Sequence, residues 1–303
     1  MLAGSRRGIA LIGVPLPWGA DRPGLEMGPA ALRSEKIKEK LESLGYSVRD
    51  AGDLAVDLLR KPCLPEEKLK HLDEIARVNR ELARLAAAVV GGGELPLVLG
   101  GDHSLAIGTV KGVLQHVRKL GVIWFDAHAD VNTESTTTTG HIHGMPLAVL
   151  LGHGHPDLVS IGGDRTLLDP TKVVMIGARS LDPGERAFLK ASGIRVFTMH
   201  EIDKFGLTAV MEEALDLVTT GTDGVHLSLD LDGVDPGEAP GVGTPVPGGL
   251  SYRESHLAME MLHESGALVS AEAVEVNPAL DAGGRTARLA VELIGSAFGE
   301  RIL

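Results

Sequence analysis

The stretch of residues 122–132, VIWFDAHADVN, joins a run of four apolar residues to a group of ionisable ones. Asp126, His128 and Asp130 occupy every second position after the apolar run. Side chains two residues apart in an extended segment lie on the same face, so these three groups are expected to form one row. Carboxylates and an imidazole in such a row are ligand types of a divalent metal ion.

Two further apolar runs end in groups of the same kind. The segment 224–232, GVHLSLDLD, ends on Asp230 and Asp232, and the segment 97–104, LVLGGDHS, carries His103 near its end. In an open parallel sheet, ligands bind beyond the carboxyl ends of the strands. Three separate strand ends that all supply ligand types therefore indicate one shared site.

Four carboxylates this close together require a counter-charge, because ionised groups repel one another and are costly to bury near a low-dielectric core. No Lys or Arg lies within these three strand ends, which favours divalent metal ions as the counter-charge. Oxygen-rich sites with some imidazole select Mn²⁺ or similar ions, and a pair of ions offers a bridging hydroxide as nucleophile. Asp102 stands just before a predicted helix, is interpreted as its N-cap, and is left out of the ligand set.

Short runs rich in Val, Ile and Leu recur along the chain and predict strands buried on both faces, as in a parallel sheet. They are residues 8–16, 95–101, 121–130, 172–179, 194–199, 224–232 and 268–278. Helical patterns lie between them at 66–90, 104–120 and 251–266, the last with a Ser251–Glu254 capping box and a stop at Gly266. Strands that alternate with helices predict a doubly wound α/β fold.

Composition and charge exclude several classes of protein. The 303 residues carry 29 basic and 41 acidic side chains, and no Lys/Arg cluster appears, which speaks against a nucleic-acid partner. No window reaches the roughly 18 apolar residues of a membrane span, so no membrane association is expected. The single cysteine, Cys63, is interpreted as a structural side chain.

The chain lacks a convincing signal peptide and is expected to be cytoplasmic. Its irregular stretches, 131–146, 152–170 and 233–249, are rich in Gly, Pro, Thr and Asp. They are expected to be functional loops of a single domain that spans residues 1–303.

Several motifs together resemble those of the ureohydrolase family, and specifically its bacterial-type arginases. They are GGDHS, DAHADVN, HGMP, SLDLDGVDP, GTPVPGGLSYRE and EVNP, and the resemblance runs from residues 22–29 to residues 275–278. It implies the arginase/deacetylase fold, three α/β/α layers around a central, mostly parallel sheet. It also implies a binuclear centre with two Mn²⁺ per subunit.

The same resemblance assigns the metal ligands motif by motif. One ion would be bound by His103, Asp126, Asp130 and Asp230, and the other by Asp126, His128, Asp230 and Asp232. Asp126 and Asp230 would then bridge the pair. The apolar run at 122–125 would then be followed by Asp126, His128 and Asp130 because its strand supplies about half of the ligands of the metal centre.

Residues on neighbouring loops would bind the substrate. By resemblance, Asn132 and Thr139 would hold an α-carboxylate and Asp182 an α-ammonium group. Glu275 would pair with a guanidinium group close to Thr244. The implied substrate-binding set is His128, Asn132, Thr139, His141, Asp182, Thr244 and Glu275, and the implied catalytic set is Asp130, His143 and Glu275.

The implied reaction is the hydrolysis of L-arginine to L-ornithine and urea by a metal-bridging hydroxide. Asp130 would help to pass a proton to the leaving amine, and His143 would exchange protons with solvent at the mouth of the cleft. His141 departs from the family pattern, because arginases commonly have Asn at this position. An altered contact at the rim is expected there, in preference to proton shuttling shared with His143.

Other interpretations stay open at this point. The nearest alternative is another ureohydrolase, which acts on agmatine, guanidinobutyrate or a related guanidino acid, and Asn132, Thr139 and Asp182 are the features that discriminate an arginase from it. Two-metal phosphoester hydrolysis is disfavoured because no Arg or Lys adjoins the ligand set. A metal-binding relative without catalysis is disfavoured because the full ligand set occurs together with Glu275 and His143.

The resemblance also implies a homotrimer or homohexamer whose partner is a small-molecule substrate, L-arginine. Arg253 and Glu254 would form an ion pair between subunits. An exposed capping pair at the start of a helix explains these two residues equally well.

Overall fold

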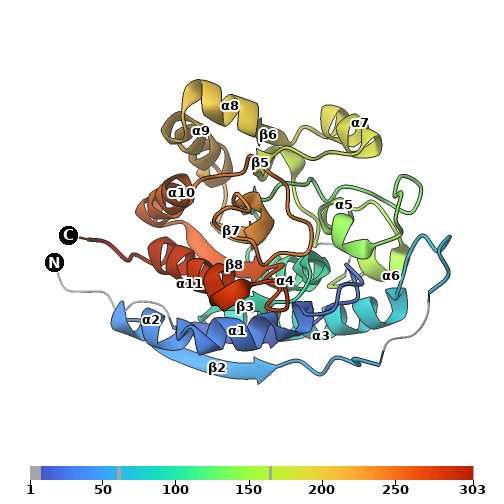
Figure 1. Ribbon diagram of the computed structural model, residues 1–303, viewed down its shortest axis with the longest axis horizontal. Helices are drawn as coiled ribbons and strands as arrows, with labels where there is room; N and C mark the ends of the chain where they lie inside the picture. Colours follow the sequence, from blue (N-terminus) through green and yellow to red (C-terminus); the bar gives the residue numbers. More distant parts are fainter. Residues whose placement is uncertain (1–7, 60–62, 164–165, 303) are drawn as a thin grey trace.

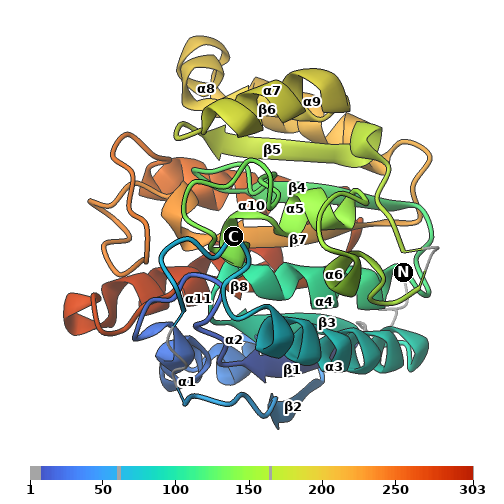
Figure 2. The same ribbon diagram turned by 90° about the vertical axis from the view of Figure 1, so that its right-hand side faces the viewer.

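Eight strands form one sheet in the computed structural model, which describes residues 8–59, 63–163 and 166–302. In chain order they are β1 (Ile9–Val14), β2 (Val48–Asp53), β3 (Leu95–Gly100), β4 (Leu120–Phe125), β5 (Val173–Ala178), β6 (Arg195–Thr198), β7 (Gly224–Asp230) and β8 (Leu268–Val274). Their spatial order is β2-β1-β3-β8-β7-β4-β5-β6, and every neighbouring pair is parallel. Figure 2 shows this order from β2 at the bottom to β5 and β6 at the top.

Helices cover both faces of the sheet (Figure 1). One face is packed by α1 (Gly28–Ser34), α2 (Ile37–Ser43), α8 (Met199–Phe205), α9 (Leu207–Thr219), α10 (Tyr252–Ser265) and α11 (Arg285–Ala297). The other is packed by α3 (Leu72–Gly91), α4 (Ala106–Val113), α5 (Pro146–Leu150), α6 (Pro156–Val159) and α7 (Pro183–Ser192). The predicted three-layer α/β/α fold is confirmed, and its described strands are all parallel. No helix of the described chain is long and apolar enough to cross a membrane.

All seven predicted strands are present, although most are shorter than the apolar runs that predict them. Strand β4 ends at Phe125 and β8 at Val274, because the polar residues that follow leave the sheet. The eighth strand, β2, is not predicted. Its sequence VRDAGD is mostly exposed at the edge of the sheet, where no apolar run is required.

Two predicted helices have different bounds in the structure. The helix predicted over 66–90 begins only at Leu72, because the preceding residues pack on another loop, to which Lys70 donates a backbone hydrogen bond. The helix predicted over 104–120 spans only Ala106–Val113, because a turn then leads the chain into β4.

The third predicted helix is confirmed as α10. The Ser251 hydroxyl caps it by accepting a hydrogen bond from the backbone N–H of Glu254. In turn, the Glu254 carboxylate accepts a hydrogen bond from the backbone N–H of Ser251. Gly266 ends the helix with a left-handed backbone, which glycine adopts without steric cost.

One lysine is fully buried between α4 and the segment around α6. The Nζ atom of Lys111 donates hydrogen bonds to the carbonyl oxygens of Val159 (2.8 Å) and Thr166 (3.1 Å). Burial lowers the pKa of this ammonium group to about 8. Lys111 therefore joins two segments at the cost of holding a charge inside the protein.

The free energy of unfolding should depend on pH through Lys111. Its pKa lies below the ordinary value of 10.5, so the unfolded chain binds more protons than the folded chain between about pH 8 and pH 10. Stability contributed by Lys111 should therefore rise with pH in this window. Between pH 7.5 and pH 10, we expect the free energy of unfolding of wild type to rise by about 2 kcal/mol relative to that of Lys111→Met protein. Urea denaturation of both proteins at pH 7.5 and pH 10 measures it, and a constant difference would contradict it.

Candidate metal centre and substrate pocket

The carboxyl ends of β3, β4 and β7 place the predicted metal ligands at one edge of the sheet. His103 begins a 3₁₀ turn after β3, Asp126 follows β4 directly, and Asp230 is the last residue of β7. Strand β7 lies beside β4, and only β8 separates β7 from β3. Because these strands all run parallel, the residues at their carboxyl ends meet.

His103 faces three carboxylates. Its Nδ1 atom lies 3.3 Å from Asp126 Oδ2, 3.0 Å from Asp130 Oδ2 and 3.1 Å from Asp230 Oδ2. All four side chains are buried. They are the four residues that the family resemblance assigns to the first metal ion.

A second group lies beside the first and shares Asp126 with it. His128 Nδ1 lies 3.5 Å from Asp126 Oδ1 and 3.1 Å from Asp232 Oδ2, so Asp126 presents one oxygen to each histidine. In each of the two groups, His103–Asp126–Asp230 and Asp126–His128–Asp232, the ligand atoms lie within 4.8 Å of one another. This spacing suits one metal ion in each group.

The donor atoms fit divalent metal ions. His103 Nδ1 and Asp130 Oδ2 are buried and lie 3.0 Å apart, yet neither atom makes a hydrogen bond with the residues that the structure describes. Burial lowers the pKa of His128, but Asp126 and Asp232 raise it to about 12. Burial and the charge of Asp126 raise the pKa of Asp130 to about 7. Protons on His128 and Asp130 thus offset part of the negative charge of these carboxylates. A bound divalent ion would offset that charge in their place and displace the protons.

Two of the predicted catalytic residues have a left-handed backbone. The φ angle is 55° at Asp130 and 64° at Glu275, a conformation that costs residues other than glycine about 1 kcal/mol or more. Backbone hydrogen bonds hold both: Leu147 N–H donates to Asp130 O (3.0 Å), and Glu275 N–H donates to Gly101 O (2.8 Å). The surrounding chain therefore maintains the strained conformation that directs these two carboxylates.

Glu275 is buried next to His143. Its Oε1 atom accepts a hydrogen bond from the backbone N–H of His103 (3.0 Å) and lies 3.0 Å from His143 Nδ1. Burial lowers the pKa of His143, but the Glu275 carboxylate raises it to about 9. Glu275 is only 1% exposed, so it is not a solvated residue at a strand end.

A cavity of about 250 Å³ opens beside the two metal-binding groups. Ten residues of the predicted site line it: His128, Asp130, Asn132, Thr139, His141, His143, Asp182, Asp230, Asp232 and Thr244. The other three, His103, Asp126 and Glu275, are buried among these residues. The structure therefore brings every predicted site residue to one place.

Asn132 and Asp182 meet at the side of this cavity. Asn132 Nδ2 donates to Asp182 Oδ2 (3.1 Å), and Asp182 begins α7 with a capping box in which Glu185 accepts from its backbone N–H (2.8 Å). Glu185 and Thr137 also line the cavity and are not predicted. The pattern DPGE at 182–185 could have indicated Glu185, because capping boxes carry Glu at this spacing.

Arg179 is a further residue that the sequence analysis misses. It follows β5, and its guanidinium group donates hydrogen bonds to the carbonyl oxygens of Gly177, Asp232, Gly233, Val234 and Val246. It thereby holds the loop that carries Thr244, whose Oγ1 donates to Asp232 Oδ2 (3.0 Å). No local pattern marks Arg179, because four of its five partners are carbonyls more than 50 residues away along the chain.

His141 stands at the rim of the cavity and contacts a second loop. Lys70 Nζ lies 3.4 Å from His141 Nε2, and Lys68 Nζ donates to the carbonyl oxygen of Thr137 (3.0 Å). Burial and the neighbouring His143 lower the pKa of His141 to about 4. His141 is therefore neutral near pH 7 and can accept a hydrogen bond from Lys70, in keeping with an altered rim contact.

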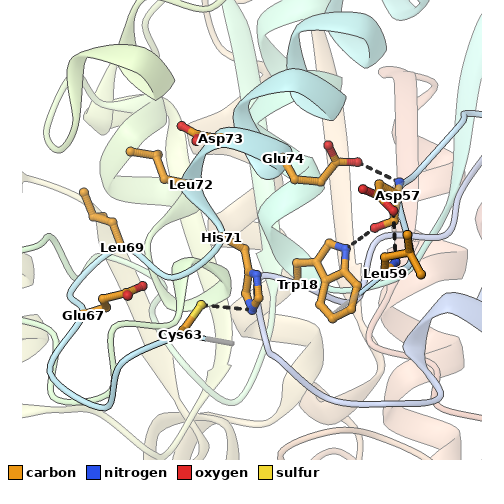
Figure 3. A pocket seen from close by; sticks show the side chains of 10 residues that line it. All are labelled: Trp18, Asp57, Leu59, Cys63, Glu67, Leu69, His71, Leu72, Asp73 and Glu74. Atoms are coloured by element: carbon orange, nitrogen blue, oxygen red, sulfur yellow. Dashed lines mark hydrogen bonds between the residues drawn. The ribbon is translucent and has the colours of Figure 1, made fainter. Parts of the chain in front are cut away.

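A separate cavity of about 270 Å³ lies at the start of α3 (Figure 3). Trp18 Nε1 donates to Asp57 O (2.7 Å), Glu74 accepts from Asp57 N–H (2.8 Å), and Cys63 Sγ lies 3.4 Å from His71 Nε2. Several polar groups of this cavity thus contact one another. Cys63 is half-buried there, which agrees with its interpretation as a structural side chain.

Comparisons with known proteins show the family of this chain. Residues 7–299 match the model of the arginase family. The chain is 54% identical to the arginase of Bacillus caldovelox over 298 residues, 97% of this chain and 99% of that protein. The solved native structure of B. caldovelox arginase superposes with a TM-score of 0.95 and 53% identity, covering 98% of this chain and all of that one. An Entamoeba histolytica arginase in complex with L-ornithine has a TM-score of 0.89 and 33% identity, covering 97% of this chain and 99% of that one. The chain belongs to the arginase family of hydrolases.

Proposed function

We propose that this chain hydrolyses L-arginine to L-ornithine and urea. The observation that carries the proposal is the position of Asp126, which presents one carboxylate oxygen to His103 and the other to His128. This arrangement supports two adjacent metal ions that share a ligand. Arginases that match nearly the full length of the chain support the same reaction, and one of them is known with L-ornithine bound.

Two Mn²⁺ per subunit are the proposed cofactors. Aspartate oxygens with some imidazole nitrogen favour Mn²⁺ over metals that prefer thiolate ligands. His103 and Asp130 would hold one ion and His128 and Asp232 the other, with Asp126 and Asp230 shared between them. When bound, such ions supply hydroxide as a nucleophile at neutral pH.

Protein side chains would orient the guanidinium group and move the protons. The buried Glu275 carboxylate would accept paired hydrogen bonds from the planar guanidinium group, which fixes its orientation. Asp130 would pass a proton to the leaving amine. His143 borders the cavity with one ring nitrogen on Glu275, which supports its role in proton exchange with solvent.

The far end of the cavity would recognise an α-amino acid. We assign the α-carboxylate to Asn132 and Thr139 and the α-ammonium group to Asp182, with His141 at the rim and Thr244 near Asp232. The hydrogen bond from Asn132 to Asp182 supports this assignment, since it uses one of the two amide hydrogens of Asn132 and leaves the other to donate to a carboxylate beside Asp182 in the same part of the cavity. Thr137 and Glu185 line the same part of the cavity, and we propose that they also lie beside the bound substrate.

Urea release by metal-stripped protein reloaded with Mn²⁺ tests the function. We expect a clear preference for L-arginine over agmatine and 4-guanidinobutyrate, and dependence on added Mn²⁺. Asp182→Asn should lower kcat/KM for arginine by about ten- to a hundredfold, because a hydrogen bond to a charged group contributes about 1.5–3 kcal/mol. The same change should leave kcat/KM for 4-guanidinobutyrate, which has no α-ammonium group for Asp182 to bind, nearly unaltered relative to wild type. Preference for agmatine in the wild-type protein would contradict the roles of Asn132, Thr139 and Asp182.

Assembly, location and domain organisation stay predictions. We propose a homotrimer or homohexamer in the cytoplasm, with residues 1–303 as one catalytic domain. The Arg253 side chain is 67% exposed, and its guanidinium lies 3.6 Å from Glu260 Oε1, so it is accessible to a neighbouring subunit. Light scattering of the purified protein measures the assembly.

A further inference from the structure

A chain of buried polar side chains leads from His103 into the centre of the sheet. His103 Nε2 lies 2.7 Å from Ser228 Oγ, and Ser228 Oγ donates to Glu272 Oε1 at 2.7 Å. His226 Nε2 lies 3.4 Å from the same Glu272 oxygen, and its Nδ1 lies 2.8 Å from Ser270 Oγ. None of these five side chains takes part in the proposed substrate contacts.

The strand period explains why these residues meet. His226 and Ser228 are two apart on β7, and Ser270 and Glu272 are two apart on β8, so each pair lies on one face of its strand. The register of the two strands places His226 beside Ser270 and Ser228 beside Glu272. All four are at most 1% exposed, in strands that are otherwise mainly apolar.

The directions of the hydrogen bonds determine which nitrogen of His103 carries a proton. A carboxylate can only accept, so the Ser228 hydroxyl donates to Glu272 and its oxygen is free to accept from His103 Nε2–H. The proton on Nε2 leaves the lone pair of Nδ1 directed at Asp126, Asp130 and Asp230, where a metal ion would bind. Histidine ligands of metal ions depend on such a partner for the orientation and tautomer of the ring.

Glu272 keeps its charge because of His226. Burial raises the pKa of this carboxyl group, but His226 beside it holds the pKa below its usual range. A buried carboxylate without such a partner would be protonated, and a protonated Glu272 could donate to Ser228 and reverse the chain of hydrogen bonds. The pair Glu272–His226 thus maintains the direction of donation from His103.

We propose that Glu272 and His226 are positioning residues of the metal centre. Through Ser228, they fix the orientation of the His103 ring and keep its proton on Nε2. The ion bound by His103 is thereby held more tightly. The inference rests on the metal centre proposed above. It predicts different effects on the two ions, because His128 has no contact with this chain of residues in the described structure.

Equilibrium dialysis of full-length protein against Mn²⁺ tests the proposal. Wild type should bind two Mn²⁺ per chain. Glu272→Gln should weaken one of the two binding steps by about ten- to a hundredfold, as loss of a histidine's supporting partner does, and leave the other within about twofold. His226→Gln, which keeps the carboxylate, should weaken the same step in the same direction.

His256→Gln is the matched control. His256 is also a buried histidine with Nδ1 2.8 Å from a serine hydroxyl, that of Ser296, but it lies on α10, away from the metal centre. It should lower the melting temperature of the metal-free protein and leave both Mn²⁺ binding steps unchanged. A purely structural role of Glu272 would give the same result as His256→Gln.

The outcomes separate this inference from the proposed function. If wild type binds no Mn²⁺, the proposed metal centre is wrong. If wild type binds two ions and a folded Glu272→Gln protein binds both equally well, the positioning role is overturned. If Glu272→Gln does not fold, the His226→Gln variant tests the positioning role instead. Unchanged Mn²⁺ binding by that variant would then overturn the positioning role.

Discussion

Replacing Asp126 by asparagine is expected to abolish tight binding of both Mn²⁺ ions and to lower urea release by about a thousandfold or more. The Oδ2 atom faces His103 and the Oδ1 atom faces His128, so one substitution removes a charged ligand from both positions. The hydroxide nucleophile then disappears, since bound metal lowers the pKa of water from about 15.7 to about 7. Metal analysis of the dialysed protein and a urea assay at saturating L-arginine measure the two effects.

Asp102→Asn is the matched control for Asp126→Asn. Asp102 is a buried aspartate at the same edge of the sheet, but its carboxylate accepts from the backbone N–H groups of Gly19 (2.7 Å) and Ser104 (2.9 Å). These contacts confirm its interpretation as a capping residue. An asparagine oxygen can accept one of the two, so this variant should retain two Mn²⁺ per chain. Retention of both ions by Asp126→Asn would show that this carboxylate does not bridge them.

Glu275→Gln is expected to lower kcat/KM for L-arginine by about two to three orders of magnitude with both Mn²⁺ ions retained. Loss of one partner of a buried charge pair costs about 2–5 kcal/mol, and each 1.36 kcal/mol is about tenfold in rate. The neutral amide cannot offer two acceptors to a guanidinium group, and the His143 ring loses the carboxylate beside it. Steady-state kinetics together with metal analysis measure this.

Glu42→Gln serves as the control, because the Glu42 side chain is exposed and its Oε1 atom lies 3.8 Å from Lys38 Nζ in a surface ion pair. It should have no effect on kinetics, as isolated surface ion pairs contribute little. Unchanged kcat/KM in Glu275→Gln would place guanidinium recognition elsewhere. Loss of Mn²⁺ instead would assign Glu275 to metal binding, through its hydrogen bond to the backbone of His103.

The locations of the strands and most of the site residues could be predicted because both leave a local pattern. Apolar runs mark strands buried on two faces, and seven of the eight strands follow such a run. The alternation at 126–130 and at 230–232 puts carboxylates in rows where the strands end, and parallel topology brings those ends together. Strand β2 is missed because an edge strand needs no apolar run.

The sequence by itself determined that acids and histidines gather at the carboxyl ends of three strands, since charge, spacing and strand period are local properties. Only the tertiary structure decided which other residues hold these acids and histidines in position. Arg179 holds carbonyls more than 50 residues away, and Glu272 reaches His103 only through the register of β7 and β8. Such contacts join residues that are distant in the chain, and a buried polar side chain becomes recognisable as a support only when its partners are known.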